Sequence, residues 1–397
     1  MMRIALLTHS VRPRGGVIHT LELAHQLARL GHHVTVIASA EPGEQLFRAV
    51  DVPVELIRLP ALSGGLVEQV RQRIAALVQA LPPLLADMDE GRFDLVHAQD
   101  SLSGNALAQL REQGVRLPPC LRTVHHLDHF DDDLLNRWQE RAWRFADGVA
   151  CVSGSWCAHF SDVYGVKAER MFNGVDLARF NPAAVPGESA RLQALGLPTV
   201  TGPVCLLVGG VEARKNTVRL LHAFAHLRAS DAHWRDARLV VAGGASMLDH
   251  SAARLEWSDA LRSHGLVEGN EVLRTGPLPD HALPMLMRRA TLLAMPSLVE
   301  GFGLAALEAL ACGTPVLVSN RQPFTEHLAD TPGVAWCDPE DVASIATGLG
   351  EAAAMPKLHD TPAVCESHSW QRSATLHADW YRRTLAALAR PAEVALT

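Results

Sequence analysis

The chain has 397 residues, which is long for one domain and predicts two. It carries 36 basic and 43 acidic side chains, for a formal net charge of −7, which argues against a basic face for nucleic acid. The mean hydropathy is near zero and no apolar run is long enough to span a bilayer. The seven cysteines are scattered without a C-x-x-C pair, which favours reduced thiols in a cytoplasmic protein.

Short apolar runs alternate with helical patterns through the first part of the chain. Strands are predicted at Arg3–Thr8, Val34–Ala38, Asp94–Ala98, Cys120–Val124 and Gly148–Val152. Helices are predicted at Ile18–Leu30, at Leu66–Leu85 and around Leu134–Phe145. Such alternation indicates a parallel sheet with helices on both faces.

The alternation pauses at Phe180–Val200, where several prolines and glycines predict a linker with a short helix. It resumes with strands at Val204–Val208, Arg238–Ala242, Glu271–Thr275, Thr291–Met295 and Pro315–Ser319. Helices are predicted near Thr217–Leu227, Ser251–His264, His281–Arg289, Leu304–Cys312, Glu340–Gly348 and Ser369–Leu388.

The predicted fold is therefore α/β, with two doubly wound, Rossmann-like domains. We place the first at 1–180 and the second at 181–369, with the C-terminal helix, 370–390, packing back on the first. Because such sheets bind ligands beyond the carboxyl ends of their strands, we expect both domains to face a central cleft.

Neither half carries a dinucleotide fingerprint or a P-loop. The segments that follow the first strand of each half, Thr8–Gly16 and Gly209–Asn216, match neither G-x-G-x-x-G nor the Walker motif. This counts against a nicotinamide dehydrogenase and against an NTPase.

Two glutamates flank a predicted strand–turn–helix. Glu300 lies on the turn after the strand, and Glu308 lies one turn inside the helix that follows. Helical side chains lean toward the N-terminus, so Glu308 can point back at the cavity that Glu300 lines. Carboxylates accept from sugar hydroxyls and free N–H groups of a helix N-terminus accept phosphate, which suggests a ligand with both groups. The alternative is that both glutamates are solvated surface residues.

Three further groups follow predicted strands. Gly15 and Gly16 precede a helix, where backbone amides can approach a phosphate closely, or they form a plain turn. Arg214 and Lys215 can neutralise a diphosphate, or they are a solvated basic pair. His125 can contact a sugar hydroxyl or act as an acid or base, or it has a structural role.

Taken in order along nearly the whole chain, these residues resemble glycosyltransferase family 4, retaining enzymes with the GT-B fold. The Gly15-Gly16 loop, Thr123-Val124-His125 and the strand and loop from Val208 to Asn216 match the family's pattern. Segments Asn173–Asp176 and Gly276–Asp280 fit as well. The stretch from Pro296 to Ala309 matches the family's E-x7-E signature, with Glu300 and Glu308 as its glutamates.

The resemblance implies a role for each matching position. Glu308 would bind the ribose of the nucleotide, and Glu300 would hold hydroxyls of the donor sugar. The backbone of Phe302, Gly303 and Leu304 would face the sugar and diphosphate. Lys215 and Arg214 would bind the diphosphate, Gly16 would allow the first domain to approach it, and His125 would line the reaction centre. We therefore class His125, Glu300 and Lys215 as catalytic. The donor-binding residues are Gly15, Gly16, Arg214, Lys215, Phe302, Gly303, Leu304 and Glu308.

The sequence departs from the family pattern at Gly210, where many members carry arginine, so the Arg214-Lys215 pair must supply most of the positive charge. No metal or other cofactor is expected, because the acidic run Asp131–Asp133 is interpreted as a solvated helix N-terminus.

The implied activity is retaining transfer from a nucleotide-diphosphate sugar, with a UDP- or GDP-sugar favoured, to an unidentified small-molecule, lipid-linked or glycan acceptor. A nucleotide-sugar epimerase and a non-catalytic nucleotide-sugar-binding subunit of a glycan-assembly complex remain the alternatives. Peripheral membrane contact is also left open, since Arg137, Arg141 and Arg144 lie at helical spacing; a solvated helix face is the favoured interpretation.

Overall fold

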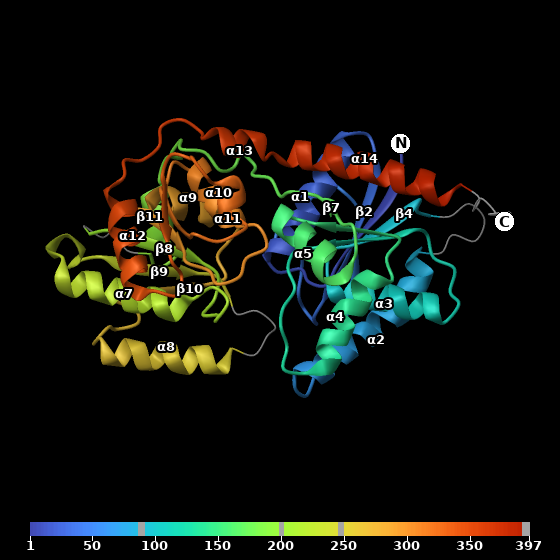
Figure 1. Cartoon of the computed structure of the whole chain (residues 1–397), viewed down its shortest axis with the longest axis horizontal. Coiled ribbons are helices and arrows are strands. Elements are labelled where there is room, and N and C mark those ends of the chain that lie inside the picture. Colours follow the sequence, from blue (N-terminus) through green and yellow to red (C-terminus); the bar gives the residue numbers. More distant parts are fainter. Residues whose placement is uncertain (86–91, 198–201, 245–249, 391–397) are drawn as a thin grey trace. The chain divides into compact units, whose positions relative to one another are not determined.

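The structure is a computed structural model that describes residues 1–85, 92–197, 202–244 and 250–390. The chain forms two compact units, drawn in Figure 1. The first unit comprises Met1–Asn173 together with Trp370–Thr397, and the second comprises Gly174–Ser369. The segment Gly174–Phe180 thus belongs to the second unit, whereas the predicted boundary assigned it to the first.

The first unit is built on a seven-stranded sheet in which every pairing is parallel. The strands are β1 (Arg3–Thr8), β2 (His33–Ala40), β3 (Val54–Arg58), β4 (Leu95–Ala98), β5 (Cys120–Val124), β6 (Gly148–Cys151) and β7 (Glu169–Arg170), in the order β3-β2-β1-β4-β5-β6-β7. The central strands are almost wholly buried, since helices cover both faces, and this explains their mostly apolar sequences.

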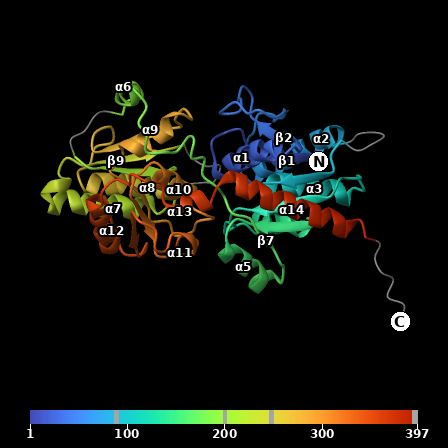
Figure 2. The same ribbon diagram turned by 90° about the horizontal axis from the view of Figure 1, so that it is seen from above.

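Helices form a layer on each side of this sheet. α1 (Gly15–Arg29) packs against α14 (Trp370–Leu388). α2 (Leu66–Leu85), α3 (Ser101–Glu112) and α4 (Asp133–Arg144) pack against one another in succession, and α5 (Gly154–Tyr164) contacts β6 and β7. Figures 1 and 2 show α14 running alongside the first unit's sheet, next to α1.

The second unit has a six-stranded parallel sheet in the order β10-β9-β8-β11-β12-β13. Its strands are β8 (Val204–Val208), β9 (Arg238–Ala242), β10 (Val272–Gly276), β11 (Leu292–Met295), β12 (Val316–Ser319) and β13 (Val334–Cys337). The helices are α6 (Glu188–Ala194), α7 (Thr217–Ser230), α8 (Ser251–Ser263), α9 (Ala282–Arg289), α10 (Leu304–Ala311), α11 (Phe324–His327), α12 (Val342–Ala354) and α13 (Ala363–Ser367), with a 3-10 turn at Ala232–Trp234.

A large apolar core lies between this sheet and the layer formed by α7, α8 and α12. Leu220, Leu221 and Phe224 of α7 are almost completely buried in it. Full burial of one such side chain stabilises the fold by roughly 1.5–3 kcal/mol, so this layer is a firm base for the loops that leave the sheet.

Both sheets reverse their strand order, the first between β1 and β4 and the second between β8 and β11. The loops that follow these four strands diverge to opposite sides of the sheet, which opens a crevice at the carboxyl ends. In the first unit the loop after β1 leads into α1 at Gly15 and the loop after β4 carries Gln99, and in the second unit the loops carry Lys215 and Glu300. Gly15, Lys215 and Glu300 therefore lie at the switch points, whereas His125 follows β5, next to β4.

Candidate active site

The loop between β8 and α7 carries the two predicted cations. The side chain of Lys215 crosses directly over the backbone of Gly209, so that a Cβ atom at Gly209 would lie 2.6 Å from Lys215 Cδ and 2.7 Å from Cε. Gly209 also has a φ of 139°, a conformation that L residues rarely adopt. Glycine at this position is therefore what allows Lys215 to take its path.

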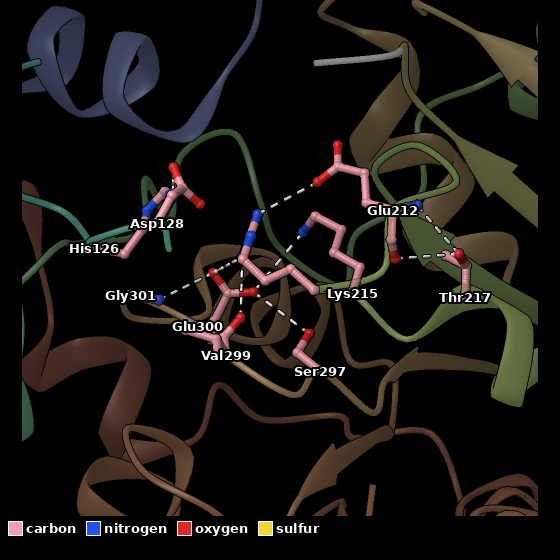
Figure 3. Close-up of polar contacts among 10 residues, drawn as sticks. His126, Asp128, Glu212, Lys215, Thr217, Ser297, Val299, Glu300 and Gly301 are labelled. Atoms are coloured by element: carbon pink, nitrogen blue, oxygen red, sulfur yellow. Dashed lines mark hydrogen bonds and ion pairs between the residues drawn. The ribbon is translucent and has the colours of Figure 1, made fainter. Parts of the chain in front are cut away.

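Both cations approach Glu300 in the loop after β11 (Figure 3). Lys215 Nζ lies 3.8 Å from Glu300 Oε2, and Arg214 Nη1 lies 3.4 Å from Glu300 Oε1. Arg214 Nη1 also donates to the Val299 carbonyl at 3.1 Å, and the Gly301 amide donates to Glu300 Oε1 at 3.2 Å. The side chains of Arg214, Lys215 and Glu300 are 24%, 18% and 14% exposed, so the cluster meets solvent without being a surface patch. The interpretation of Glu300 as an ordinary surface residue is wrong.

Asn216 fastens this loop to its neighbours. Its Nδ2 group donates to the carbonyls of Pro296, at 2.9 Å, and Pro339, at 2.6 Å, and its Oδ1 accepts from Arg219 at 3.0 Å. The residue is buried and left-handed, with a φ of 59°, a conformation that asparagine tolerates better than most residues. Asn216 thereby fixes the loops after β8, β11 and β13 to one another, and with them the positions of Lys215 and Glu300.

The turn into α10 has little conformational freedom. Gly303 has a φ of 95°, and a Cβ atom there would lie 2.4 Å from Cε1 of Phe324. The ring of Phe302 is buried and stacks on His327, with ring centroids 4.6 Å apart and planes 4° apart. The Phe302 side chain therefore supports the turn from inside, and the backbone of Phe302, Gly303 and Leu304 is what this turn can offer to a ligand.

Glu308 lies in the second turn of α10 and is 6% exposed. A buried carboxyl group requires hydrogen-bonding or charged partners, because removing it from water alone is costly. The interpretation of Glu308 as a solvated helix residue is therefore wrong.

In the first unit, Gly16 and His125 are in contact. A Cβ atom at Gly16 would lie 3.4 Å from His125 Cδ2, whereas one at Gly15 would meet no atom within 4 Å. The sequence predicted that both glycines precede the helix, but they form the first turn of α1. Arg14 is extended, and the helix begins directly after it. A Cβ atom at Gly16 would make ordinary van der Waals contacts with His125, so packing alone does not require glycine at either position.

His125 is enclosed by polar and aromatic neighbours. Its Nε2 lies 3.3 Å from Gln99 Oε1, and its ring meets that of His19 edge to face at 4.8 Å between centroids. Burial, followed by the nearby charges of His19 and Arg122, holds the pKa of His125 well below its usual value. His125 is therefore a neutral imidazole at pH 7, able to donate from one nitrogen and accept at the other.

Comparison with known proteins identifies the family. A model described as "Glycosyltransferase Family 4" matches residues 13–179, and one described as "Glycosyl transferases group 1" matches residues 196–363. The D-inositol 3-phosphate glycosyltransferase of Salinispora arenicola is 30% identical over 94% of this chain and 88% of its own length. That of Frankia alni is 32% identical over 80% of each. The chain belongs to glycosyltransferase family 4.

Solved structures agree on the fold of this glycosyltransferase. Sucrose-phosphate synthase from Thermosynechococcus elongatus superposes with a TM-score of 0.78 at 22% identity, over 98% of this chain and 100% of the other. Anabaena HepE, in complex with UDP and glucose, superposes with a TM-score of 0.74 at 20% identity, over 96% and 100%. The predicted GT-B fold, with two Rossmann-like parallel-sheet domains, is confirmed.

Two other sequence interpretations of the glycosyltransferase can be compared with the structure. Asp132 caps α4 by accepting from the amides of Leu134, at 2.8 Å, and Leu135, as expected for a helix N-terminus. In the arginine stripe on α4, Arg141 pairs with Glu112 and Arg144 with Glu140, as on a solvated helix face. Within the described ranges, no helix has the length and apolarity to cross a membrane.

Three residues that lie beside predicted site residues of the glycosyltransferase, two in the second unit and one in the first, were not predicted from the sequence. Gly209 and Asn216 flank the cations in the sequence, but their roles depend on a lysine that folds back and on carbonyls up to 123 residues away. Gln99 follows β4 directly, and position at the carboxyl end of a strand is the signal that would have marked it.

Proposed function

We propose that this glycosyltransferase moves a sugar from a nucleotide-diphosphate sugar to an acceptor hydroxyl with retention of anomeric configuration. The observation that carries the proposal is the Arg214–Lys215–Glu300 cluster at the β8/β11 switch point. It combines two cations with a carboxylate beside the first turn of a helix, which suits a ligand that has both a diphosphate and sugar hydroxyls.

The cations stabilise the leaving group. As the bond to the sugar breaks, negative charge accumulates on the nucleotide diphosphate, and cations already in place stabilise it more than solvent would. Arg214 and Lys215 are held beside Glu300 at 3.4 and 3.8 Å, distances from which both side chains can turn to phosphate oxygens. Backbone N–H groups add further hydrogen-bond donors for the phosphate oxygens. They lie at the start of α10 and at Gly16, where no side chain hinders the approach of a phosphate.

The carboxyl groups bind hydroxyls and do not act as nucleophiles. We assign Glu308 to the ribose and Glu300 to the donor sugar. A buried carboxylate such as Glu308 binds a ribose hydroxyl more strongly than one in water, because the local dielectric is low. Glu300 is fixed by the Gly301 amide and by both cations, so its oxygens have a defined direction.

His125 acts as a neutral hydrogen-bonding group at the reaction centre. Its lowered pKa means that it does not place a positive charge beside an oxocarbenium-like sugar. The departing phosphate takes the proton of the acceptor hydroxyl on the same face of the sugar, which accounts for retention without a covalent enzyme intermediate.

We propose a UDP- or GDP-sugar as donor, no metal or other cofactor, and a cytoplasmic reaction. HepE, a protein of the same fold, was solved with UDP and glucose, which favours the uridine nucleotide. All seven cysteines are free of disulfides, as is usual in a reducing compartment. The acceptor is a small molecule, a lipid-linked sugar or a glycan, and the relatives named for D-inositol 3-phosphate make that compound the first acceptor to test.

The test has two stages. Thermal shift with UDP-, GDP- and ADP-sugars identifies the donor, because a ligand that binds only the folded state raises the melting temperature. Incubation of that donor with D-inositol 3-phosphate, monosaccharides and lipid-linked sugars, followed by NMR of the anomeric proton, then identifies acceptor and stereochemistry. An epimer formed from donor alone would instead indicate an epimerase, and donor binding without turnover a binding subunit. Absence of any sugar-nucleotide binding would refute the proposal.

A further inference from the structure

A buried hydrogen-bond chain runs from the C-terminal helix to His125 in the first unit. Tyr381 of α14 places its hydroxyl 2.6 Å from Nδ1 of His97, and the Gln99 amide nitrogen lies 3.2 Å from the same atom. The other nitrogen of His97 lies 2.8 Å from Thr123 Oγ1. Gln99 Oε1 then meets His125 Nε2 at 3.3 Å. His97, Gln99 and Tyr381 are at most 2% exposed, so solvent does not compete for these bonds.

The chemistry of the groups sets the direction of each bond. An amide nitrogen only donates, so Gln99 donates to the ring of His97, where its closer partner is Nδ1 and Nε2 is 3.4 Å away. The Tyr381 hydroxyl lies closer to Nδ1 than the amide does, and it donates to that nitrogen when His97 carries its proton on Nε2, the nitrogen that faces Thr123. The Gln99 oxygen only accepts, and the proton that it receives is the one on Nε2 of His125.

We propose that Gln99 is a positioning residue that sets the tautomer of His125, keeping its proton on Nε2 and leaving Nδ1 as the nitrogen that can accept a hydrogen bond. The effect of this tautomer on turnover rests on the proposed role of His125 in sugar transfer. The tautomer itself does not, because it follows from contacts within the first unit.

The groups around His125 favour a single neutral tautomer. His19 from α1, His97 from β4 and the adjacent His126 face it, together with Arg122 from its own strand. His19 donates from Nδ1 to Asn173 Oδ1 at 2.7 Å, and burial lowers its pKa to about 4. Arg122 is therefore the permanent charge in this set, and as a cation it opposes protonation of His125. The ring of His19 also packs edge to face on that of His125, with centroids 4.8 Å apart, which limits rotation of the His125 ring.

Tyr381 connects this chain to α14. Its ring is fully buried, and its hydroxyl donates to the same nitrogen of His97 that receives the Gln99 amide. The hydroxyl therefore orients the ring of His97, and it acts on Gln99 only through that ring, without touching His125. Gln99, not Tyr381, is the residue whose removal changes the tautomer.

The test is 15N NMR of histidine-labelled protein, with the His125 signals assigned from a His125→Gln variant. In the wild-type protein His125 should show a protonated Nε2 and a bare Nδ1. Gln99→Leu removes the hydrogen-bond acceptor of His125, so both neutral tautomers of His125 should be present. Removal of a partner that orients a functional imidazole lowers activity by on the order of 10- to 100-fold, and we expect a loss of this size in kcat. The donor KM should change less. Tyr381→Phe is the control, and it should keep the Nε2-protonated form.

Gln99→Glu has nearly the same shape and tests the electrostatics if the leucine variant does not fold. A carboxylate there accepts from Nε2 of His125 but also favours the imidazolium, so the acid limb of the pH–rate profile should move to higher pH. A wild-type His125 protonated on Nδ1, or a tautomer unchanged in folded Gln99→Leu, would overturn the inference. Full turnover in His125→Gln, together with a changed His125 tautomer in Gln99→Leu, would instead refute the proposed function and leave the role of Gln99 intact.

Discussion

Substituting Gly209 by alanine should weaken donor binding although Gly209 has no side chain to contact the donor. The added Cβ atom would lie 2.6 Å from Lys215 Cδ, closer than two carbon atoms can approach, so the lysine must leave its path. A charge-assisted hydrogen bond contributes about 1.5–3 kcal/mol, and its loss corresponds to a roughly 10- to 150-fold weaker Kd for the donor. The positive φ of 139° adds strain of about 1–3 kcal/mol, which lowers stability as well.

Titration calorimetry with the donor nucleotide separates these effects when three variants accompany Gly209→Ala. Gly31→Ala introduces strain at a φ of 85° with no atom within 4 Å, so it should lower stability and leave donor affinity unchanged. Lys215→Met should weaken binding on its own. In the double variant, Gly209→Ala should add little to Lys215→Met, because the lysine through which it acts is gone. A full additive loss in the double variant would refute the steric argument.

Three further effects are expected. Asn216→Ala should raise donor KM by about 10-fold or more, because it removes two hydrogen bonds that join the site loops and leaves a left-handed backbone unfavourable for alanine. Glu308→Gln should reduce donor affinity by about 10-fold with the melting temperature nearly unchanged, since the amide fills the same volume but lacks the charge. The free energy of unfolding, measured in urea, should fall as the pH drops from about 6.5 toward 4. Burial lowers the pKa of His19 to about 4 and that of His377 to about 3, so in this range the unfolded chain binds protons that the folded chain does not.

Each of these effects has its own check. Asn105→Ala is the control for Asn216→Ala. Asn105 is also a buried asparagine that donates to two carbonyls, those of Ser101 and Trp138, and it is remote in sequence from the donor loops. Its replacement removes the same number of hydrogen bonds and should leave donor KM unchanged. Equal donor KM in both alanine variants would contradict the role of Asn216. For Glu308, unchanged affinity for the free nucleotide would contradict its assignment to the ribose. A urea midpoint that is constant between pH 7.5 and 5 would show that the buried histidines do not titrate as argued.

The sequence predicts the interior strands well because burial on both faces makes them mostly apolar, although β5 includes Arg122 and Thr123. Arg3–Thr8, Cys120–Val124 and Val204–Val208 have the predicted bounds. The edge strands β3 and β13 were not predicted, since Val54–Arg58 includes charged residues and Val334–Cys337 is buried only at alternate positions. Helix α3 was missed as well, because its small and polar residues give a weak helical pattern while Asp100 and tertiary packing define it.

The donor-side residues could be located from sequence order, whereas their geometry could not. Arg214, Lys215 and Glu300 follow strands β8 and β11, and the structure brings them together at the switch point. That Lys215 requires Gly209 beneath it, or that Asn216 reaches Pro339, depends on how loops from different strands meet. Likewise, no spacing rule connects Tyr381 with His97, which lie 284 residues apart.

Helix α14 also has a consequence for the order in which this protein is made. The second unit, Gly174–Ser369, is contiguous in the chain, whereas the first receives α14 only after the whole second unit has been synthesised. At translation rates of about 5–20 residues per second, the nascent first unit waits on the order of 10–40 s with the place of Trp370, Trp380 and Tyr381 unfilled. During that interval His97 lacks its tyrosine partner and the apolar face of α1 is uncovered. The N-terminal half of this glycosyltransferase is therefore the first to leave the ribosome and the last to be completed, and the nascent chain is most in need of chaperones while it waits.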